Sequence, residues 1–332
     1  MKKIPVLFVI IILLCFGFKD NEISFTKNFK VTTPANITIS TSGGNITATG
    51  SDKDIVEVDF IVRKRGHLFQ VSLEELQKLV DLEIINENDK LEISVRKSYE
   101  ENISVGFNIK APFKSSCNLN TSGGNIGIAD LNGTQVVNTS GGNLDIKNIT
   151  GKIEGHTSGG NVDIENSQGD VIAKTSGGNM NLKNIEGKVE AKTSGGHIKI
   201  DNSKFDVNAE TSGGSIELND VQGKIDLNTS GGHVLLDNVS GSVVAKTSGG
   251  NIKAYIVKLS EKLILQTSGG DIDAEIPSGL GLDLNLSAEK INASLDNFKG
   301  RTEKGKVVGQ MNGGGIQVDL TTSGGDVNLN FK

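Results

Sequence analysis

The sequence predicts an all-β fold, a single-stranded parallel β-solenoid (β-helix) of 18-residue coils with irregular caps at both ends. The first observation behind this prediction is a repeat, since Thr-Ser-Gly-Gly recurs in steps of 18 residues from Thr121 to Thr247. The second is the alternation of apolar residues with a period of two, which indicates half-buried strands. The third is composition. The 332 residues include 42 Gly and only 4 Pro, without a collagen-like period, and corners between short strands require Gly.

The chain begins with the pattern of an export signal in residues 1–17. Two Lys form a charged start, an apolar run follows, and Cys15-Phe16-Gly17 is a candidate cleavage site. We therefore expect an exported protein that is periplasmic, at the cell surface or secreted, with a lipid anchor on Cys15 as the alternative. No later apolar stretch approaches the roughly 18 residues of a membrane helix, so no integral span is expected in the mature chain.

Residues 28–120 are predicted to form an irregular N-terminal solenoid segment, or cap, with a helical insertion near residues 72–81. Alternating apolar segments in this region predict strands. Ser72 and Glu75 have the spacing of a capping box, which predicts the start of a helix. Thr-Ser-Gly-Gly also occurs at Thr41, so this region is related to the repeats that follow.

Residues 121–275 are predicted to form the regular 18-residue-repeat solenoid. Numbering each repeat from its Thr as place 1, apolar residues hold places 6 and 8 and again places 15 and 17, so each coil should have two short strands and two Gly corners. We expect these four places to be buried and places 9 and 14 to be exposed. Charges at place 14 alternate in sign along Lys152, Asp170 and Lys188, as expected for coils stacked in register about 4.8 Å apart.

Three other positions of the repeat carry predictions. Place 10 is Asn or Asp throughout the regular array, and these side chains should bond turn backbone and one another, the alternative being a ligand-binding row. The place-1 Thr should point inward and satisfy corner backbone groups, the alternative being an exposed row that binds ice or another surface. Phe205 replaces the Gly found at place 13 of the other coils, which predicts a locally altered corner; a partner-binding anchor is the alternative.

Residues 276–332 are predicted to form C-terminal coils and a cap. The 18-residue pattern is lost after Ile276-Pro277, and Thr-Ser-Gly-Gly returns only at Thr322. An uncapped solenoid would expose unpaired strand edges and its core, so atypical ends are expected.

The repeats resemble those of the bacterial putative-adhesin family, a domain of unknown function in exported β-solenoids. The resemblance is carried by the Thr-Ser-Gly-Gly coils, by the strand Phe107-Asn108-Ile109-Lys110-Ala111-Pro112, and by Gly-Gly-Gly-Ile-Gln-Val with a last Thr-Ser-Gly-Gly-Asp-Val in residues 313–327. It covers roughly residue 28 to the C-terminus. It implies an exported solenoid with an adhesin-like role, and it brings no catalytic residues.

No catalytic, cofactor-binding or metal site is predicted, and the binding residues are unknown. The His residues are His67, His156, His197 and His233. His197 and His233 share place 5 but lie two coils apart, about 9.6 Å, too far to share one metal ion, so they are interpreted as solvated corner residues. A calcium β-roll would need Gly and Asp where Leu144 and Ile146 stand.

We expect the protein to need no metal or cofactor, because one Asn or Asp per coil spreads ligands along the axis instead of gathering them. A fall in thermal stability in EDTA would instead assign calcium to corners at Asp130, Asp220 or Asp271. An enzyme is not expected. The regular coils have no room for the long loops of polysaccharide-acting β-helix enzymes, and no Ser lies in a Gly-x-Ser-x-Gly setting.

The net charge of -6 offers no general attraction to nucleic acid or anionic lipid. The predicted function is a non-enzymatic exported cell-envelope or surface scaffold, an adhesin-like protein with an unknown protein or envelope-surface partner. The alternative is an envelope sensor or assembly component whose segment 64–104 makes the specific contact, and a polysaccharide-acting enzyme is third. A ligand cleft beside residues 64–104, or a flat exposed apolar face on the coils, would separate the first two.

Overall fold

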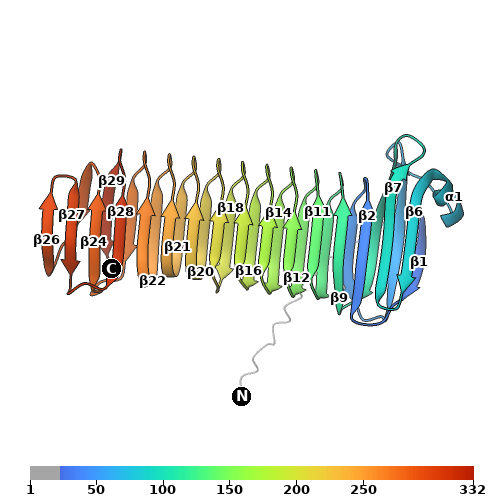
Figure 1. Cartoon of the computed structure of the whole chain (residues 1–332), viewed down its shortest axis with the longest axis horizontal. Coiled ribbons are helices and arrows are strands. Elements are labelled where there is room, and N and C mark those ends of the chain that lie inside the picture. Colours follow the sequence, from blue (N-terminus) through green and yellow to red (C-terminus); the bar gives the residue numbers. More distant parts are fainter. Residues whose placement is uncertain (1–22) are drawn as a thin grey trace, which may run out of the picture.

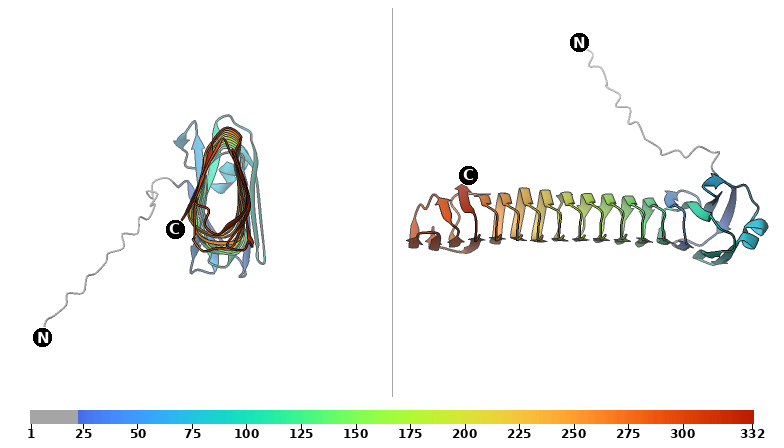
Figure 2. Two further views of the ribbon diagram at one scale, coloured as in Figure 1. Left: turned by 90° about the vertical axis from the view of Figure 1, so that its left-hand side faces the viewer. Right: turned by 90° about the horizontal axis from the view of Figure 1, so that it is seen from above.

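The computed structural model describes residues 23–332, which form one long β-solenoid of 29 strands with a single short helix (Figure 1). Viewed along the axis, the coils superimpose as one flattened outline (Figure 2). The β-solenoid prediction is confirmed. The predicted signal, residues 1–17, and Cys15 lie outside the described residues. Between residues 23 and 332, no helix has the length and apolar character needed to span a bilayer.

The regular coils build two facing parallel sheets. The place-6 sheet holds places 6–12 and the place-15 sheet holds places 15–18. The first contains β10 (Ile126–Asn132), β12 (Leu144–Thr150), β14 (Val162–Gln168), β16 (Met180–Glu186) and β18 (Ile198–Ser203). The second contains β11 (Gln135–Thr139), β13 (Ile153–His156), β15 (Val171–Lys174), β17 (Val189–Lys192) and β19 (Val207–Glu210). Both strands of a coil then run together in β20 (Ile216–Asn228), β21 (Val234–Lys246) and β22 (Ile252–Gln266).

Successive coils pair in parallel, mostly with a register shift of 18 residues, as in Ile126↔Leu144 and Val171↔Val189. Places 6, 8, 15 and 17 are buried along the array, as predicted. Place 14 is exposed except at Ser242, which is 6% exposed, and most residues at place 9 are only half-exposed, so the predicted exposure of these two places holds in part. The charges at place 14 do not pair with one another. Instead, the Asp170 carboxylate accepts the backbone N–H of Lys188 in the next coil at 2.9 Å. Because Asp alternates with Lys at place 14, such a side-chain acceptor is present in every second coil.

Place 11 is a buried position that strand alternation did not predict. Its residues are at most 1% exposed: Leu131, Ile149, Ser167, Ile185, Ser203, Val221 and Val239. The cause is place 10, where every residue from Asp130 to Asn238 has a left-handed backbone with φ between 53° and 59°. Such a residue interrupts the two-residue alternation, so places 9 and 10 both face outward and place 11 turns inward.

Thr41 starts a coil that belongs to the stack although 80 residues separate it from Thr121. Its first strand, β2 (Ala35–Thr41), lies between β9 (Ser115–Thr121) and β7 (Lys90–Ser98) and pairs in parallel with both, with Thr41 opposite Thr121. Its second strand, β3 (Ile46–Ser51), lies between β10 and β8 (Ile103–Pro112) in the same way. The chain between β3 and β9 therefore lies beyond this coil, at the end of the stack, with β7 and β8 paired to β2 and β3.

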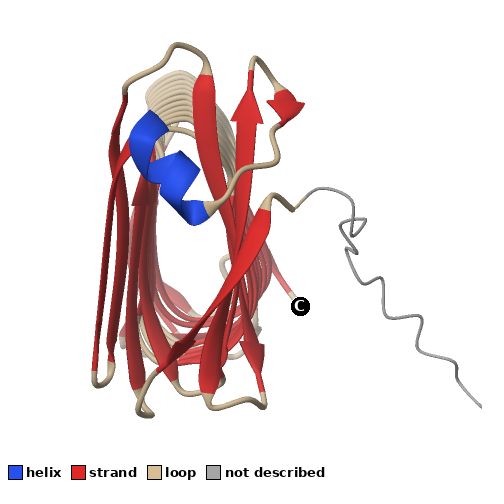
Figure 3. Ribbon diagram, turned by 90° about the vertical axis from the view of Figure 1, so that its right-hand side faces the viewer, coloured by secondary structure: helices blue, strands red, loops and turns tan. Residues whose placement is uncertain are grey.

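Antiparallel strands and the helix complete the N-terminal end. They are β1 (Phe25–Lys30), β4 (Ile55–Lys64), β5 (His67–Leu68), α1 (Leu73–Leu79) and β6 (Val80–Glu87). The predicted capping box of Ser72 and Glu75 is present, but the helix ends at Leu79 because Val80 already has the extended backbone of β6. Leu76 is fully buried, and α1 lies across the opening between the two sheets (Figure 3).

The C-terminal end repeats this device. Its strands are β23 (Ile272–Ile276), β24 (Leu282–Ser287), β25 (Lys290–Ala293), β26 (Phe298–Glu303), β27 (Lys306–Met311), β28 (Ile316–Thr321) and β29 (Asp326–Phe331). β28 lies between β22 and β24, and β29 lies between β23 and β25. The Thr322 corner thus stacks directly on the Thr267 corner, although residues 280–311 separate them in the chain.

The corner at Phe205 differs from the place-13 corner of five other coils, where Gly has φ between 129° and 156°. Gly187 of the preceding coil lies outside this range as well, so the difference is not specific to Phe205. The Phe205 side chain is 48% exposed.

Candidate functional site

The Thr-Ser-Gly-Gly corner forms a continuous internal hydrogen-bond ladder. The Thr139 hydroxyl donates to the carbonyl of Gly124 in the preceding coil at 2.8 Å and accepts the N–H of Gly142 at 3.2 Å. The same donation runs from Thr121 at one end to Thr322 at the other. All eleven Thr of the motif are between 2% and 7% exposed. The interpretation as a structural ladder is confirmed, and the Thr row is no exposed binding surface.

A second ladder runs along place 5 and includes two of the His residues. The Asn143 side-chain oxygen accepts the N–H of Asn161 at 2.8 Å, and similar bonds continue from coil to coil. At His197 and His233 the acceptor is Nδ1, at 3.0 and 2.9 Å from the next coil's N–H. Both imidazoles are exposed corner groups, as expected. Sequence reasoning did not predict that these imidazoles act as acceptors. The signal was present, because the other coils have Asn, Ser or Asp at place 5, each with a side-chain oxygen that can accept a hydrogen bond.

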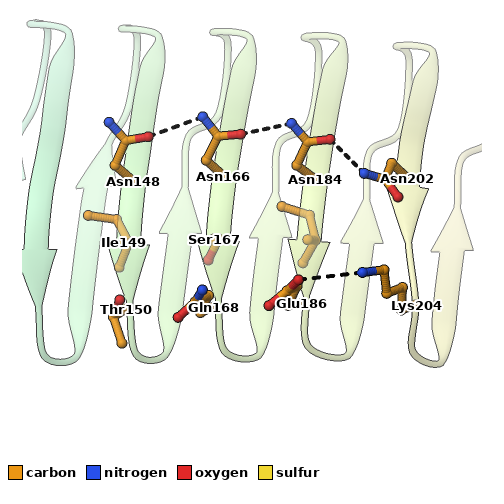
Figure 4. A pocket seen from close by; sticks show the side chains of 11 residues that line it. Asn148, Ile149, Thr150, Asn166, Ser167, Gln168, Asn184, Glu186, Asn202 and Lys204 are labelled. Carbon is orange, nitrogen blue, oxygen red and sulfur yellow. Dashed lines mark hydrogen bonds and ion pairs between the residues drawn. The ribbon is translucent and has the colours of Figure 1, made fainter.

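A third ladder follows place 10 on the outside of the molecule. The Asn166 amide donates to Asn148 at 3.1 Å, and Asn184 and Asn202 each donate to the preceding Asn at 2.8 Å (Figure 4). The predicted bonding of these side chains to one another is confirmed. Asn and Asp suit this place because they tolerate a left-handed backbone better than other residues with a side chain.

Beside this ladder lies a shallow depression that we call the lateral groove (Figure 4). It has a volume of about 370 Å³ and crosses four coils. Place-10 amides form one rim and place-12 side chains the other, where Glu186 and Lys204 pair at 3.6 Å. Its lining residues are Asn148, Ile149, Thr150, Asn166, Ser167, Gln168, Asn184, Ile185, Glu186, Asn202 and Lys204.

Two buried place-11 hydroxyls of the regular coils lack a partner among the described residues, and one of them, that of Ser167, belongs to a residue that lines the lateral groove. Ser167 and Ser203 occupy buried place 11, where the coil between them has Ile185, and neither hydroxyl makes a hydrogen bond within the described residues. An unsatisfied buried hydroxyl costs about 1–3 kcal/mol. The alternation of Ser and Ile at this place was visible in the sequence, but only the fold shows that it lies inside.

A second depression, the junction groove, lies where the coils meet the irregular N-terminal segment. It has a volume of about 430 Å³ and is bounded by the ends of β2, β7, β9 and β11. Its lining residues are Ser40, Thr41, Ser42, Ser94, Val95, Arg96, Asn120, Thr121, Ser122, Asn138, Thr139 and Ser140. The Asn138 amide donates to Asn120 at 2.9 Å, and Arg96 pairs with Glu83. Residues 94–96 of the segment 64–104 line this depression, which favours the alternative in which that segment takes part in the specific contact.

Comparison with known proteins identifies the fold. The family model Toastrack DUF4097 matches the chain in two overlapping segments, residues 26–224 and 206–330. The chain belongs to this family. No protein with a curated description matches it.

Similar solved structures come from several bacteria. A putative adhesin from Bacteroides fragilis NCTC 9343 is 18% identical, with 75% of this chain and 96% of that chain covered and a TM-score of 0.37. A putative lipid binding protein from Parabacteroides distasonis ATCC 8503 is 17% identical, with the same coverage and TM-score. A putative cell adhesion protein from Clostridium sporogenes ATCC 15579 is 14% identical, with 95% and 96% covered and a TM-score of 0.19. The resemblance to the putative-adhesin family is confirmed by the family model, which matches residues 26–224 and 206–330.

The residues that sequence reasoning considered for metal binding take structural roles in this Toastrack chain. Asp130 accepts the Asn148 amide at 2.9 Å, Asp220 accepts that of Asn238, and Asp271 accepts the Asp326 N–H at 2.9 Å. Within residues 23–332, no three His, Cys, Asp or Glu side chains come together as metal ligands. His67 is exposed and His156 half-exposed, each in a different part of the Toastrack fold.

Cys117 is buried in the Toastrack core, and its burial raises the pKa of the thiol to about 12. The thiol is therefore protonated at neutral pH and is no nucleophile there. Large exposed apolar side chains are spread along the solenoid instead of forming one flat face. Within the described residues they are Tyr99, Phe113, Phe205, Tyr255, Val257 and Val308.

Proposed function

We propose that the protein is a non-enzymatic, exported, adhesin-like scaffold of the cell envelope or cell surface whose specific contact is made at the junction groove. The observation that carries this proposal is the composition of that groove. Hydroxyls and amides of three stacked coils face the same depression as residues 94–96 of the irregular segment 64–104. One side of the groove is therefore formed by the irregular residues 94–96, and the other side by equivalent residues of three stacked coils.

The chemistry of the junction groove favours a polar ligand with many hydroxyl or carbonyl groups, such as an envelope glycan. Its exposed lining has hydrogen-bond donors and acceptors from Ser and Asn, a guanidinium at Arg96 and no aromatic side chain, whereas its three Thr hydroxyls are used in the internal ladder. Ligand binding here needs no catalytic group, metal or cofactor. The regular coils hold the groove at one end of a long rigid rod.

Replacement of Ser122 by Trp tests the proposal. Ser122 is an exposed place-2 residue that lines the junction groove, and an indole there would fill the groove without entering the core. We expect Ser122→Trp to weaken binding to isolated cell envelopes and to a glycan array at least about tenfold, the effect of losing roughly 1.4 kcal/mol. Ser194→Trp, at the same place of a distant coil, is the matched control and should bind normally.

The lateral groove is the second candidate contact, because place-10 amides of four stacked coils form one rim and the pair of Glu186 and Lys204 lies on the other. Gln168→Trp would fill this groove, and Gln222→Trp is its control at place 12 outside it. If Gln168→Trp lowers binding and Ser122→Trp does not, the lateral groove is the site. Equal binding by all four variants and the unmodified protein would contradict both assignments.

Export and metal independence are parts of the same proposal. Fractionation of producing cells should find the protein outside the cytoplasm, and mass spectrometry of its N-terminus should show cleavage near residue 17 or a lipid on Cys15. The melting temperature should be the same with and without EDTA. A fall of several degrees in EDTA would contradict the metal-independent scaffold.

A further inference from the structure

The place-15 sheet ends in an unpaired strand at both ends of the molecule. At the N-terminal end the last strand is β6, which pairs only with β7, and at the C-terminal end it is β26, which pairs only with β27, within the described residues. An unpaired strand edge presents a row of backbone N–H and C=O groups that can pair with another strand.

The directions of these two edge strands are compatible with each other. β6 is antiparallel to β7 and therefore runs opposite to the coil strands. β24 is parallel to β28, β27 is antiparallel to β24, and β26 is antiparallel to β27, so β26 runs with the coil strands. If a second copy continued the same axis, its β6 would meet β26 in an antiparallel pair.

The outer faces of the two edge strands carry opposite charge. On β6, Glu83 lies opposite Ser94 and shares the outer face with Asp81 and Glu87 by strand alternation. On β26, Phe298 pairs with the buried Met311, so Lys299, Arg301 and Glu303 alternate with it and face outward, and all three are exposed. The two cations outnumber the single carboxylate, so this outer face is basic on balance.

Most of these charges have no partner within one molecule. Glu83 pairs with Arg96, but Asp81, Lys299 and Arg301 form no ion pair within residues 23–332. In an antiparallel register with Lys299 opposite Glu83, Arg301 would lie opposite Asp81. Opposite charges directly across strands stabilise pairing and select the register.

The inner faces fit the same register. With Lys299 opposite Glu83, the half-buried Phe298 would lie opposite the half-buried Ile84, and Gly300 opposite Leu82. Apolar surface left partly exposed on both edge strands would thus be covered on the core side of the sheet.

Both ends are also stepped, in opposite senses, by two strands at the C-terminal end and by one strand at the N-terminal end. At the C-terminal end the place-15 sheet continues past β28 with β24, β27 and β26, whereas the place-6 sheet adds only β25 after β29. At the N-terminal end the place-6 sheet adds β8, β4 and β1 beyond β3, whereas the place-15 sheet adds only β7 and β6 beyond β2. The sheet that projects at one end is recessed at the other.

From these three features we propose that the partner of the two open edges is a second copy of this chain, and that copies join head to tail through β26 of one and β6 of the next. The contact is heterologous, because different surfaces meet, so it repeats along the axis and builds open-ended fibres instead of closed dimers. Since opposite charges on exposed faces select the contact, assembly weakens as salt rises.

Sedimentation velocity over a concentration series tests the proposal. At low ionic strength, the weight-average mass of the unmodified protein should rise with concentration beyond that of a dimer. Charges are already screened over about 10 Å at roughly 0.1 M salt, so 0.5 M NaCl should return the protein to the monomer. The paired variant Lys299→Glu with Arg301→Glu should stay monomeric, and so should Asp81→Lys with Glu83→Lys. Asp81→Lys alone provides a milder change that keeps the pair between Glu83 and Arg96.

Mixing the two paired variants is the decisive step. One variant has two acidic ends and the other two basic ends, so neither should assemble alone and an equimolar mixture should assemble in alternation. Lys188→Glu with Lys224→Glu, in the middle of the solenoid, is the control and should assemble like the unmodified protein. A monomer under all conditions would overturn the proposal. So would a dimer that grows no further and survives Asp81→Lys, because β26 would then pair with itself.

Discussion

The two ends of the solenoid have the same topology but bury different amounts of apolar surface. At each end the chain leaves the stack after one Thr-Ser-Gly-Gly coil, builds outer strands, and returns to lay the next coil against the one it left. The N-terminal end adds α1 and an aromatic cluster, in which the fully buried Phe60 stacks on Phe25 at 4.5 Å and meets Phe107 edge-on at 5.2 Å. The C-terminal end has only strands and leaves Ile291, Leu295 and Phe298 partly exposed.

This comparison shows that two features of each end are independent: the Thr-Ser-Gly-Gly corner, which joins the last coil to the stack, and the covering, meaning the strands and helix that pack over that coil. The Thr ladder passes without a break from Thr41 through Thr322, so both ends belong to the same stack. What differs is the material laid over the last coil. Both coverings leave apolar side chains partly exposed, among them Leu82 and Ile84 at the N-terminal end, but only the N-terminal covering adds a fully buried aromatic ring. The C-terminal open edge carries exposed basic groups beside its apolar ones.

The largest expected difference between the ends comes from their Phe residues. Phe60→Ala should lower the free energy of unfolding by about 3–5 kcal/mol, because it empties the centre of a packed aromatic cluster. Phe298→Ala should cost clearly less, because its ring is already partly in water. Urea unfolding of dilute samples measures both. Equal losses would mean that the two coverings are equally packed.

The corner should be equally sensitive at both ends. A Cβ on Gly124 would lie 1.9 Å from the Gly44 carbonyl oxygen, and one on Gly325 would lie 2.3 Å from that of Gly270. We expect Gly124→Ala and Gly325→Ala each to cost about 1–3 kcal/mol or more, since backbone must shift. Gly123→Ala meets nothing within 4 Å and should lie within about 0.5 kcal/mol of the unmodified protein.

The helix cap is a stabilising feature of the N-terminal end. The Ser72 hydroxyl accepts the Glu75 N–H at 3.2 Å, and the Glu75 carboxylate accepts the Ser72 N–H at 2.8 Å. Ser72→Ala should cost about 1 kcal/mol, as measured by thermal unfolding. Ser72→Asp keeps an acceptor and should recover most of this loss. If Ser72→Ala has no effect, α1 contributes nothing to closing this end.

The smallest effect concerns pH. A hydrogen bond from Lys110 lowers the pKa of Glu57, whose side chain is 20% exposed, on β4 of the N-terminal end. Because the folded pKa is lowered, the stabilisation is present above the unfolded pKa and is lost as pH falls through the folded pKa. Glu57→Gln should therefore lose about 0.5–1 kcal/mol at pH 7 and approach the unmodified protein in acid. Glu303→Gln, on exposed β26, is the control for removal of a carboxylate at the surface.

The sequence by itself determined the repeating unit. The 18-residue period, the buried places 6, 8, 15 and 17, the inward Thr and the Asn ladder all follow from interactions between a residue and its equivalent one coil away. Such interactions recur at every coil, so the pattern exposes them. The capping box at Ser72 can also be predicted from the sequence, but for a different reason: its two partners are only three residues apart.

Only the tertiary structure decided which coils are neighbours at the ends and what the outside offers. The Thr41 corner could make the same hydrogen bonds with any other Thr-Ser-Gly-Gly corner. The entropic cost of closing a loop also grows only slowly with loop length. No local signal therefore places β2 between β7 and β9. The burial of Ser167 and Ser203 depends on the left-handed turn at place 10, which resets the alternation. The junction groove and both open edges exist only once segments far apart in the sequence are stacked, whereas the lateral groove is lined by residues of four consecutive repeats that the 18-residue spacing connects.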